Sequence, residues 1–332
     1  MSSIAQKSKA GERLILKACF QFYRQGLSHT EIAANLRISR FQVARLLRTA
    51  LEENYVTVKI LEPEHWYPEL ERHLEEEFGL RAALVIDNDD LDEEEAKRRV
   101  ADAAGRYLLE VLSDGDVLGV SLGSTIRALI EQLPYRIGLP IQVVQLIGGS
   151  PRKLSDLSSM ILAVQLADRF GTNPHLLYAP AMVNGESARR LLLADPNIRA
   201  TVRMFKRVTI SVLGIGALTT GTTSRLLYEQ FIDSELRQQL RDRGAVGDVL
   251  SYIYRRDGNI VAGSLEDRLI AMPLQDHLKV PYRVGIASGE AKALAIEGAM
   301  RAKLINVLVT DSKAAGAICS RMGAVRRGGH SG

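Results

Sequence analysis

LSHTEIAANLRISRFQVARLLRTAL, residues 27–51, is the stretch that decides how the N-terminal part of this chain folds. Ser28 and Glu31 form an S-x-x-E capping box, which predicts the start of a first helix. Ser39 predicts the cap of a second helix, in which apolar residues recur at i, i+3, i+4 and i+7. Two short helices joined by a tight turn, with arginines and a glutamine on the free face of the second, are typical of a helix-turn-helix.

The free face of the second helix carries side chains that can read DNA. Arginine pairs with guanine, glutamine pairs with adenine, and an aromatic ring can contact the methyl group of thymine. We therefore expect this helix to enter the major groove of double-stranded DNA, with base contacts from Arg40, Phe41, Gln42 and Arg45. Contacts to the DNA phosphates are expected from Arg37, Ser39 and Arg48.

The distribution of charge supports this interpretation. Residues 1–50 contain nine lysines or arginines and two glutamates, a net charge of +7, whereas the whole chain carries +4. The remainder is therefore at −3, which suits a small nucleic-acid-binding unit on a larger part that avoids a polyanion. The alternative, an ordinary solvated basic helix face, is less favoured because residues 32–51 contain no acidic side chain.

Length and composition are those of a soluble globular protein. The 332 residues suggest two domains, and 46% of them are hydrophobic and 25% charged. No apolar run approaches the roughly 20 residues that cross a membrane, and the N-terminus lacks the apolar segment of a secretory signal. The two cysteines, Cys19 and Cys319, lack metal-like spacing. We expect a cytoplasmic protein without a metal or redox cofactor.

Beyond a linker bracketed by Pro63 and Pro68, short apolar strands alternate with helices. Strands are expected at residues 82–86, 116–120, 141–147, 175–178, 208–213, 283–287 and 305–310. This alternation predicts an α/β fold with a helix-covered, mostly parallel, Rossmann-like sheet. In front of it, a helix over residues 13–23 and a short strand over residues 55–60 would complete a small all-α (winged) helix-turn-helix unit.

Glycine clusters follow four of the predicted strands. They lie at residues 121–125, 148–150, 214–216 and 288–289. Ligands of parallel sheets bind where the strands end, and glycine turns that open helices present backbone N–H groups to anions. Lys292 could add a full positive charge. The repeated turns indicate a small phosphorylated or carboxylated ligand, although any single one could be only a tight corner.

One of these turns also matches a catalytic motif. Residues 119–123 read G-V-S-L-G, the G-x-S-x-G pattern of a nucleophile elbow, between a strand and a helix. Asp248 or Asp267, followed by His277, would supply the acid and the histidine of an α/β-hydrolase in the required order. This hydrolase is a minor alternative, because it leaves the helix-turn-helix unexplained.

A spaced series of segments extends through the rest of the chain. They read GVSLGST (119–125), QLIGG (145–149), YAPA (178–181), GIG (214–216), GAVGD (244–248), DR (267–268), ASGEAKA (287–293) and TD (310–311). With the helix-turn-helix, this series resembles the SorC-type sugar-binding transcriptional regulators of bacteria, from about residue 12 to residue 320. The spaced series is far more specific than any one motif.

The resemblance implies a large domain similar to phosphosugar isomerases, with the NagB/RpiA-like fold, that binds a sugar phosphate at the strand ends. Carried over by motif, the effector-binding residues are Ser121, Gly123, Ser124, Thr125, Gly148, Gly149, Gly216, Gly247, Asp248, Gly289 and Lys292. The glycine turns and Lys292 would hold the phosphate. Asp248 would face the sugar hydroxyls, because a carboxylate can accept two hydrogen bonds from a diol, or it could cap a helix or turn.

Three further side chains have open or ordinary roles. Arg268 could bind an anion or pair with a surface acid such as Asp267. His175 and His277 are expected to be packed or surface side chains rather than catalytic groups.

Two residues depart from the pattern of the resembled family. Arg37 stands where that family commonly has glycine in the turn, so a non-glycine residue must adopt or avoid a left-handed conformation there, at a cost of about 1 kcal/mol. Leu122 replaces an aromatic residue in the phosphate turn, which affects the shape of the ligand pocket.

These observations predict a transcriptional regulator of a carbohydrate-metabolism operon, controlled by a phosphorylated sugar, and not an enzyme. We expect residues 1–62 to bind DNA, residues 63–320 to bind the effector and form a homo-oligomer (dimer or tetramer), and residues 321–332 to be a disordered tail. Paired DNA-binding domains would bind a pseudo-palindromic operator. A phosphosugar isomerase-like enzyme is the other alternative, favoured by fold analogy alone.

Overall fold

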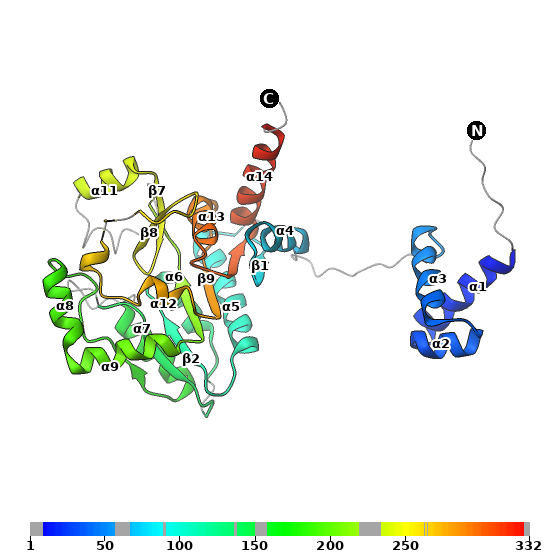
Figure 1. Ribbon diagram of the computed structural model, residues 1–332, viewed down its shortest axis with the longest axis horizontal. Coiled ribbons are helices and arrows are strands. Elements are labelled where there is room, and N and C mark those ends of the chain that lie inside the picture. Colours follow the sequence, from blue (N-terminus) through cyan, green and yellow to red (C-terminus); the bar gives the residue numbers. More distant parts are fainter. Residues whose placement is uncertain are drawn as a thin grey trace. The chain divides into compact units, whose positions relative to one another are not determined.

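The computed structural model describes residues 9–56, 67–88, 91–135, 138–149, 158–218, 234–261, 263 and 265–328. The chain forms two compact units, Met1–Glu64 and His65–Gly332, which we call the head and the body (Figure 1). Each unit has its own hydrophobic core. They are described separately below.

The head contains the predicted helix-turn-helix. Helix α1 (Lys9–Cys19) continues as a π-helix, η1 (Phe20–Arg24), and is followed by α2 (His29–Leu36) and α3 (Arg40–Glu52). Both predicted caps are present, and each is a full capping box: Ser28 with Glu31 for α2, and Ser39 with Gln42 for α3. The buried side chains of the three helices, among them Ile32 and Val43, form one small core.

Arg37 adopts the left-handed conformation in the turn, with φ 56° and ψ 46°. The N–H of Ile38 donates to the Ala33 carbonyl at 3.0 Å, and the N–H of Arg37 donates to the Ala34 carbonyl at 3.3 Å. These two bonds are those of a Schellman motif, which satisfies the last carbonyls of α2 and normally has glycine at this position. Arg37 is therefore held in a conformation that costs an L-residue roughly 1–2 kcal/mol.

The predicted strand over residues 55–60 is described only at its first two residues. Tyr55 and Val56 pack against the core of the head, and neither lies in a strand. Residues 57–60 lie outside the described part of the chain, so the predicted wing stays a prediction.

The body is organised by a seven-stranded parallel sheet, in the order β1-β10-β9-β5-β2-β3-β4. Six predicted strands are present, at β1 (Ala82–Ile86), β2 (Val117–Val120), β3 (Gln142–Gln145), β5 (Ile210–Gly214), β9 (Tyr282–Ile286) and β10 (Val307–Asp311). The seventh, predicted over residues 175–178, is the two-residue strand β4 (Pro174–His175) and shares only His175 with the prediction. Most residues of the strands are apolar and buried because both faces of the sheet are covered. The predicted α/β class is confirmed.

Each face of the sheet has its own layer of helices. One core joins the sheet to α5 (Glu93–Val111), α6 (Ser124–Gln132) and α7 (Ser159–Phe170). The core on the other face includes side chains from α4 (Pro68–Phe78), α9 (Pro196–Met204), α13 (Ala293–Arg301) and α14 (Ser312–Gly328). Alternate residues of a strand enter opposite cores, as Leu308 and Val309 of β10 do. The shorter helices of the body are α8 (Glu186–Ala194), α11 (Ser234–Asp242) and α12 (Leu274–His277).

A second, three-stranded sheet was not predicted from the sequence. It pairs β6 (Gly216–Ala217), β7 (Ala245–Val249) and β8 (Tyr252–Arg255) in antiparallel order. Its strands are short and two of them contain glycine, so they lack the apolar β-branched runs that indicate a strand. The β7–β8 hairpin is closed by Leu250 and Ser251, which both have positive φ, at 51° and 65°. Such a two-residue turn usually contains asparagine or glycine.

The predicted start of a disordered tail at residue 321 is wrong. Helix α14 continues to Gly328, and of the predicted tail only residues 329–332 lie outside the described part of the chain. The small and apolar residues Ala314, Ala315, Ile318 and Met322 are buried against the body, which gives the helix a packed face. Among the residues described, no helix is both long enough and apolar enough to cross a membrane.

His277, in α12, is completely buried. Its Nε2 atom lies 2.7 Å from the Leu304 carbonyl oxygen, and because a carbonyl only accepts, this nitrogen carries the proton. Its Nδ1 atom is buried and has no hydrogen-bond partner among the described residues. Burial lowers the pKa of His277 from its ordinary value of 6.5 to about 4. His277 is thus a packed side chain, as expected.

We predict that His277 makes the body sensitive to acid. Between pH 6.5 and pH 4 the unfolded chain protonates this histidine and the folded chain does not, so the free energy of unfolding falls as the pH falls, by about 2–3 kcal/mol at pH 4.5. Urea unfolding at pH 7.5 and pH 4.5, followed by circular dichroism, measures the loss. His277→Gln retains an N–H donor for Leu304 but has no group that titrates, so this loss of stability on acidification should be absent from it. The matched variant His73→Gln, at a partly exposed site, should behave as the wild type does.

We also predict that glycine at position 37 relaxes the turn of the head. Arg37→Gly and Arg37→Ala both remove the guanidinium, but only glycine adopts a positive φ without strain. The free energy of unfolding of the head should therefore be about 1 kcal/mol higher in the Gly variant than in the Ala variant. Hydrogen exchange of the Ile32 and Val43 amides in the full chain reports that stability. Equal protection in the two variants would show that the turn is unstrained.

Candidate DNA-binding surface and effector site

The seven residues predicted to contact DNA all lie on the exposed surface of α3 and the turn before it. They are Arg37, Ser39, Arg40, Phe41, Gln42, Arg45 and Arg48. The ring of Phe41 is the extreme case, because 89% of its surface is open to solvent. A large aromatic side chain this exposed contributes nothing to the core of the head, so it is available to a partner.

The described residues of the head do not neutralise the arginines of this surface. Among its described residues, no acidic side chain pairs with Arg40, Arg45 or Arg48. Unpaired guanidinium groups on one helix face attract phosphates and can form two hydrogen bonds with a guanine edge.

Two of the predicted contact residues also hold the helix cap. Ser39 Oγ accepts from the Gln42 N–H at 3.2 Å, and Gln42 Oε1 accepts from the Ser39 N–H at 2.8 Å. Reading an adenine with two hydrogen bonds requires both Oε1 and Nε2 of glutamine. In this structure only Nε2 of Gln42 is available, so full adenine contact requires the cap bond to open. The S-x-x-Q spacing of Ser39 and Gln42 in the sequence already indicated this cap bond.

The turn after β2 has the geometry of an anion site. Gly123, with φ 118°, precedes α6 and supplies no side-chain cap for the first N–H groups of the helix. Ser121 and Thr125 are buried, and Ser124 is partly exposed. Ser121 Oγ accepts from the N–H of Gly214 at 3.1 Å, which ties this turn to the end of β5. Uncapped N–H groups at the positive end of a helix bind anions.

Gly148 and Gly149 do not offer phosphate donors in this structure. The N–H of Gly148 donates to the Ile270 carbonyl and that of Gly149 to the Ala179 carbonyl, both at 2.9 Å. A Cβ on Gly148 would lie 2.5 Å from the Pro180 carbonyl carbon. Glycine is needed here because two backbone segments approach closely, and the predicted phosphate contact would have to displace these hydrogen bonds.

Gly216, Gly247 and Asp248 belong to the small sheet. Gly216 pairs with Asp248 across the β6–β7 ladder. A Cβ on Gly247 would lie 2.5 Å from the Gly216 carbonyl oxygen and 2.7 Å from Ala295 Cβ, so this glycine lets the sheet pack on α13. Asp248 is buried, and its Oδ2 accepts from the Ser251 N–H at 3.2 Å. Asp248 therefore caps the hairpin turn, the alternative role that the sequence left open.

Gly289 and Lys292 lie in the segment that follows β9. Gly289, with φ 94°, donates its N–H to Asp311 Oδ2 at 2.5 Å, and Lys292 ends the short helix η4 (Glu290–Lys292). Burial, and next the positive charge of Lys97, lower the pKa of Lys292. The carboxylates of Glu93, Asp248 and Asp311 oppose that shift, so these groups lie within electrostatic range of the lysine.

Sequence reasoning missed two charged residues at this edge. Asp311 is completely buried, and its two oxygens accept from the N–H groups of Gly289 and Ala314, which joins the ends of β9 and β10. Lys97, near the start of α5, is buried and pairs with Glu94 at 2.5 Å. In the sequence, Lys97 follows an acidic run at helical spacing, which is typical of a solvated surface pair. The TD segment did include Asp311, without a role for it.

The structure does not support the hydrolase alternative. Ser121 is absent from the non-glycine residues with positive φ in the described chain, whereas a nucleophile elbow is a strained turn. Its hydroxyl is bound to Gly214, and the ring of His277 to Leu304, so the two do not form a serine–histidine pair. Arg268, the other side chain with an open role, donates from Nε to the Val183 carbonyl at 3.0 Å.

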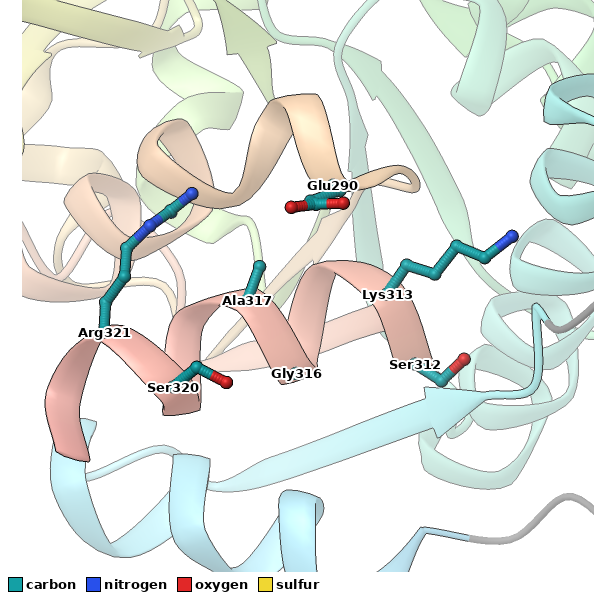
Figure 2. A pocket seen from close by; sticks show the side chains of 7 residues that line it. All are labelled: Glu290, Ser312, Lys313, Gly316, Ala317, Ser320 and Arg321. Carbon is teal, nitrogen blue, oxygen red and sulfur yellow. The ribbon is translucent and has the colours of Figure 1, made fainter. Parts of the chain in front are cut away.

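An open groove of about 420 Å³ lies beside these turns, between η4 and α14 (Figure 2). Six of its lining residues come from α14 and the seventh comes from η4: Ser312, Lys313, Gly316, Ala317, Ser320, Arg321 and Glu290. None of them belongs to the predicted effector-binding set, so this groove is a separate feature of the surface.

Comparisons with known proteins agree with this architecture. Residues 67–320 match the model of the Sugar-bind family, described as "Putative sugar-binding domain". The deoxyribonucleoside regulator of Bacillus subtilis (strain 168) is 29% identical over 307 residues, 92% of this chain and 97% of that protein. The sorbitol operon regulator of Klebsiella pneumoniae is also 29% identical over 307 residues, 91% of this chain and 96% of that protein.

The fold of a solved relative is also similar. The crystal structure of the full-length sorbitol operon regulator SorC from Klebsiella pneumoniae superposes with a TM-score of 0.72 at 28% identity, and covers 92% of this chain and 98% of that one. The resemblance inferred from the spaced motifs is confirmed. The chain belongs to the family of SorC-type sugar-binding transcriptional regulators.

Proposed function

We propose that this protein regulates transcription of a carbohydrate-metabolism operon and that a phosphorylated sugar controls it. Its head binds double-stranded operator DNA through α3, and its body binds the effector at the carboxyl ends of the parallel strands. The observation that carries the proposal is the surface of α3, where arginines with no acidic partner among the described residues surround an almost fully exposed phenylalanine. Such a surface fits a DNA groove and has no role in the core of the head.

Control by the effector requires two sites that influence each other. We propose that the chain assembles into a dimer or tetramer, which presents paired heads to a pseudo-palindromic operator in the cytoplasm. An effector that binds one quaternary arrangement more tightly than another shifts the operator affinity, and the operator shifts the effector affinity by the same factor. The proposal is that of a binding protein and not of an enzyme.

The test of DNA recognition compares two arginines of α3. Arg45 faces the expected base edges, so Arg45→Ala should reduce the preference for operator over unrelated DNA by roughly 5- to 150-fold, the loss of one good base contact. Arg48→Ala should weaken binding to both DNAs equally and lower the salt dependence by about one phosphate. Titration of the purified protein against its own promoter at several salt concentrations measures both effects. A wild-type protein without sequence preference would overturn the proposal, and Arg169→Ala in the body is the control.

The test of the effector site removes one ammonium group. A panel of phosphosugars is screened by thermal shift, and a true effector at about 100 times its Kd should raise the melting temperature of the wild type by about 5 °C. Lys292→Met retains the apolar stem of the side chain and should abolish the rise. Lys279→Met removes an exposed charge near the opposite edge of the sheet and should leave the rise intact. If no phosphosugar shifts the wild type, the effector class is wrong.

A further inference from the structure

Three positively charged side chains from different segments lie toward the edge of the sheet where the effector is proposed to bind, because α5, α6 and η4 each begin after a strand that ends at this edge. They are Lys97 of α5, Arg127 of α6 and Lys292 of η4. Lys97 and Lys292 are close enough for each charge to act on the other, and Glu94 lies within range of both Lys97 and Arg127. Arg127 Nε is buried and has no hydrogen-bond partner among the described residues, although Glu131 lies 3.7 Å away. These three cations share the edge with carboxylates, among them Glu94 beside Lys97 and Glu131 beside Arg127, so the edge carries charges of both signs.

Like charges of this kind are costly outside water unless an anion joins them. Carboxylates of the body itself supply only part of the negative charge that such an anion would bring. The side-chain ammonium of Lys292 forms no hydrogen bond or ion pair with the described residues. Of the carboxylates near it, those of Asp248 and Asp311 already accept backbone N–H groups. The Lys292 ammonium therefore lies within electrostatic range of carboxylates, but no carboxylate among the described residues bonds to it directly.

Lys97 has a carboxylate partner that another anion can displace. Its side chain is only 8% exposed, whereas that of Glu94, 2.5 Å away, is 65% exposed. The bond from Lys97 lowers the pKa of Glu94, so this carboxylate is ionised at neutral pH. An exposed carboxylate is held weakly, because water screens the pair and replaces its hydrogen bonds. The buried lysine stays in place while the exposed glutamate can turn into solvent.

We propose that Lys97 is a second cationic contact for the phosphate of the effector, and that Glu94 occupies its ammonium until the phosphate replaces it. This inference rests on the proposed function, which locates the effector at this edge. A phosphate monoester carries a charge of roughly −1.5 to −2 at neutral pH, enough to neutralise Lys97 and Lys292 together. A sugar without phosphate cannot do so. The lysine pair therefore selects phosphorylated over unphosphorylated ligands, and Glu94 is a built-in competitor.

The test uses inorganic phosphate as the probe, titrated into the full-length protein by calorimetry at constant ionic strength. Lys97→Met should weaken phosphate binding at least tenfold. Glu94→Gln should tighten it by about threefold or more, because the competing carboxylate is gone. Lys279→Met, which removes a lysine near the opposite edge of the sheet, should bind phosphate as the wild type does. Formate, a monoanion, should bind more weakly than phosphate to the wild type and should distinguish little between the variants.

The outcomes separate this inference from the proposed function. If Lys292→Met abolishes phosphate binding while Lys97→Met leaves it unchanged, only the role of Lys97 is refuted. If the wild type does not bind phosphate, the role of Lys97 is refuted, whereas the proposed effector class is still decided by the phosphosugar panel. Should Lys97→Met fail to fold, Glu94→Gln decides the matter alone, and unchanged or weaker phosphate binding in that variant refutes the competition. If the Lys97–Glu94 pair is purely structural, both substitutions lower the melting temperature and neither changes the affinity for phosphate.

Discussion

Parallel pairing of the seven strands is the constraint on which the rest of the body depends. Parallel strands need crossover connections, and the helices that provide them must cover both faces of the sheet. All strands then end at the same edge, so the turns after β2, β5, β9 and β10 become neighbours although they are far apart in sequence. The bond from Gly214 to Ser121 and the bond from Gly289 to Asp311 each join two of these strand ends. The candidate effector site is a product of this shared edge.

Charge is distributed differently in the two units, and for different physical reasons. In the head, the arginines of α3 point into solvent, where their charge acts on a long polyanion through many weak contacts. In the body, Lys97 is buried and Lys292 is half-buried, and a single compact anion gains much more from meeting such partly desolvated cations. We propose that the same residue chemistry serves a broad DNA-contact surface in the head and a compact anion site in the body. The coupling between them is what would make the protein a switch.

Much of the fold could be predicted from the sequence, and the failures have particular causes. Six of the seven strands were recognisable because apolar residues predominate in the predicted runs, and the helix-turn-helix because Ser28 and Ser39 cap its helices. The small sheet was missed because the glycine-containing segment around Gly247 has no strand pattern of its own and forms by pairing with distant segments. The site was found only in part. The motifs indicated Lys292, whereas Lys97 looked like an ordinary partner of the acidic residues before it.

The sequence by itself determined the local features: where helices begin and end, which faces are apolar, and that position 37 carries a residue other than glycine. It also determined the family, because a spaced series of motifs survives in the linear chain. Only the tertiary structure decided what the glycines and charges do. Gly148 proved to be a point of close backbone approach, Asp248 a turn cap, and Lys97 a buried cation. Burial, hydrogen-bond partners and neighbouring charges depend on segments far away in sequence, so no local pattern can specify them.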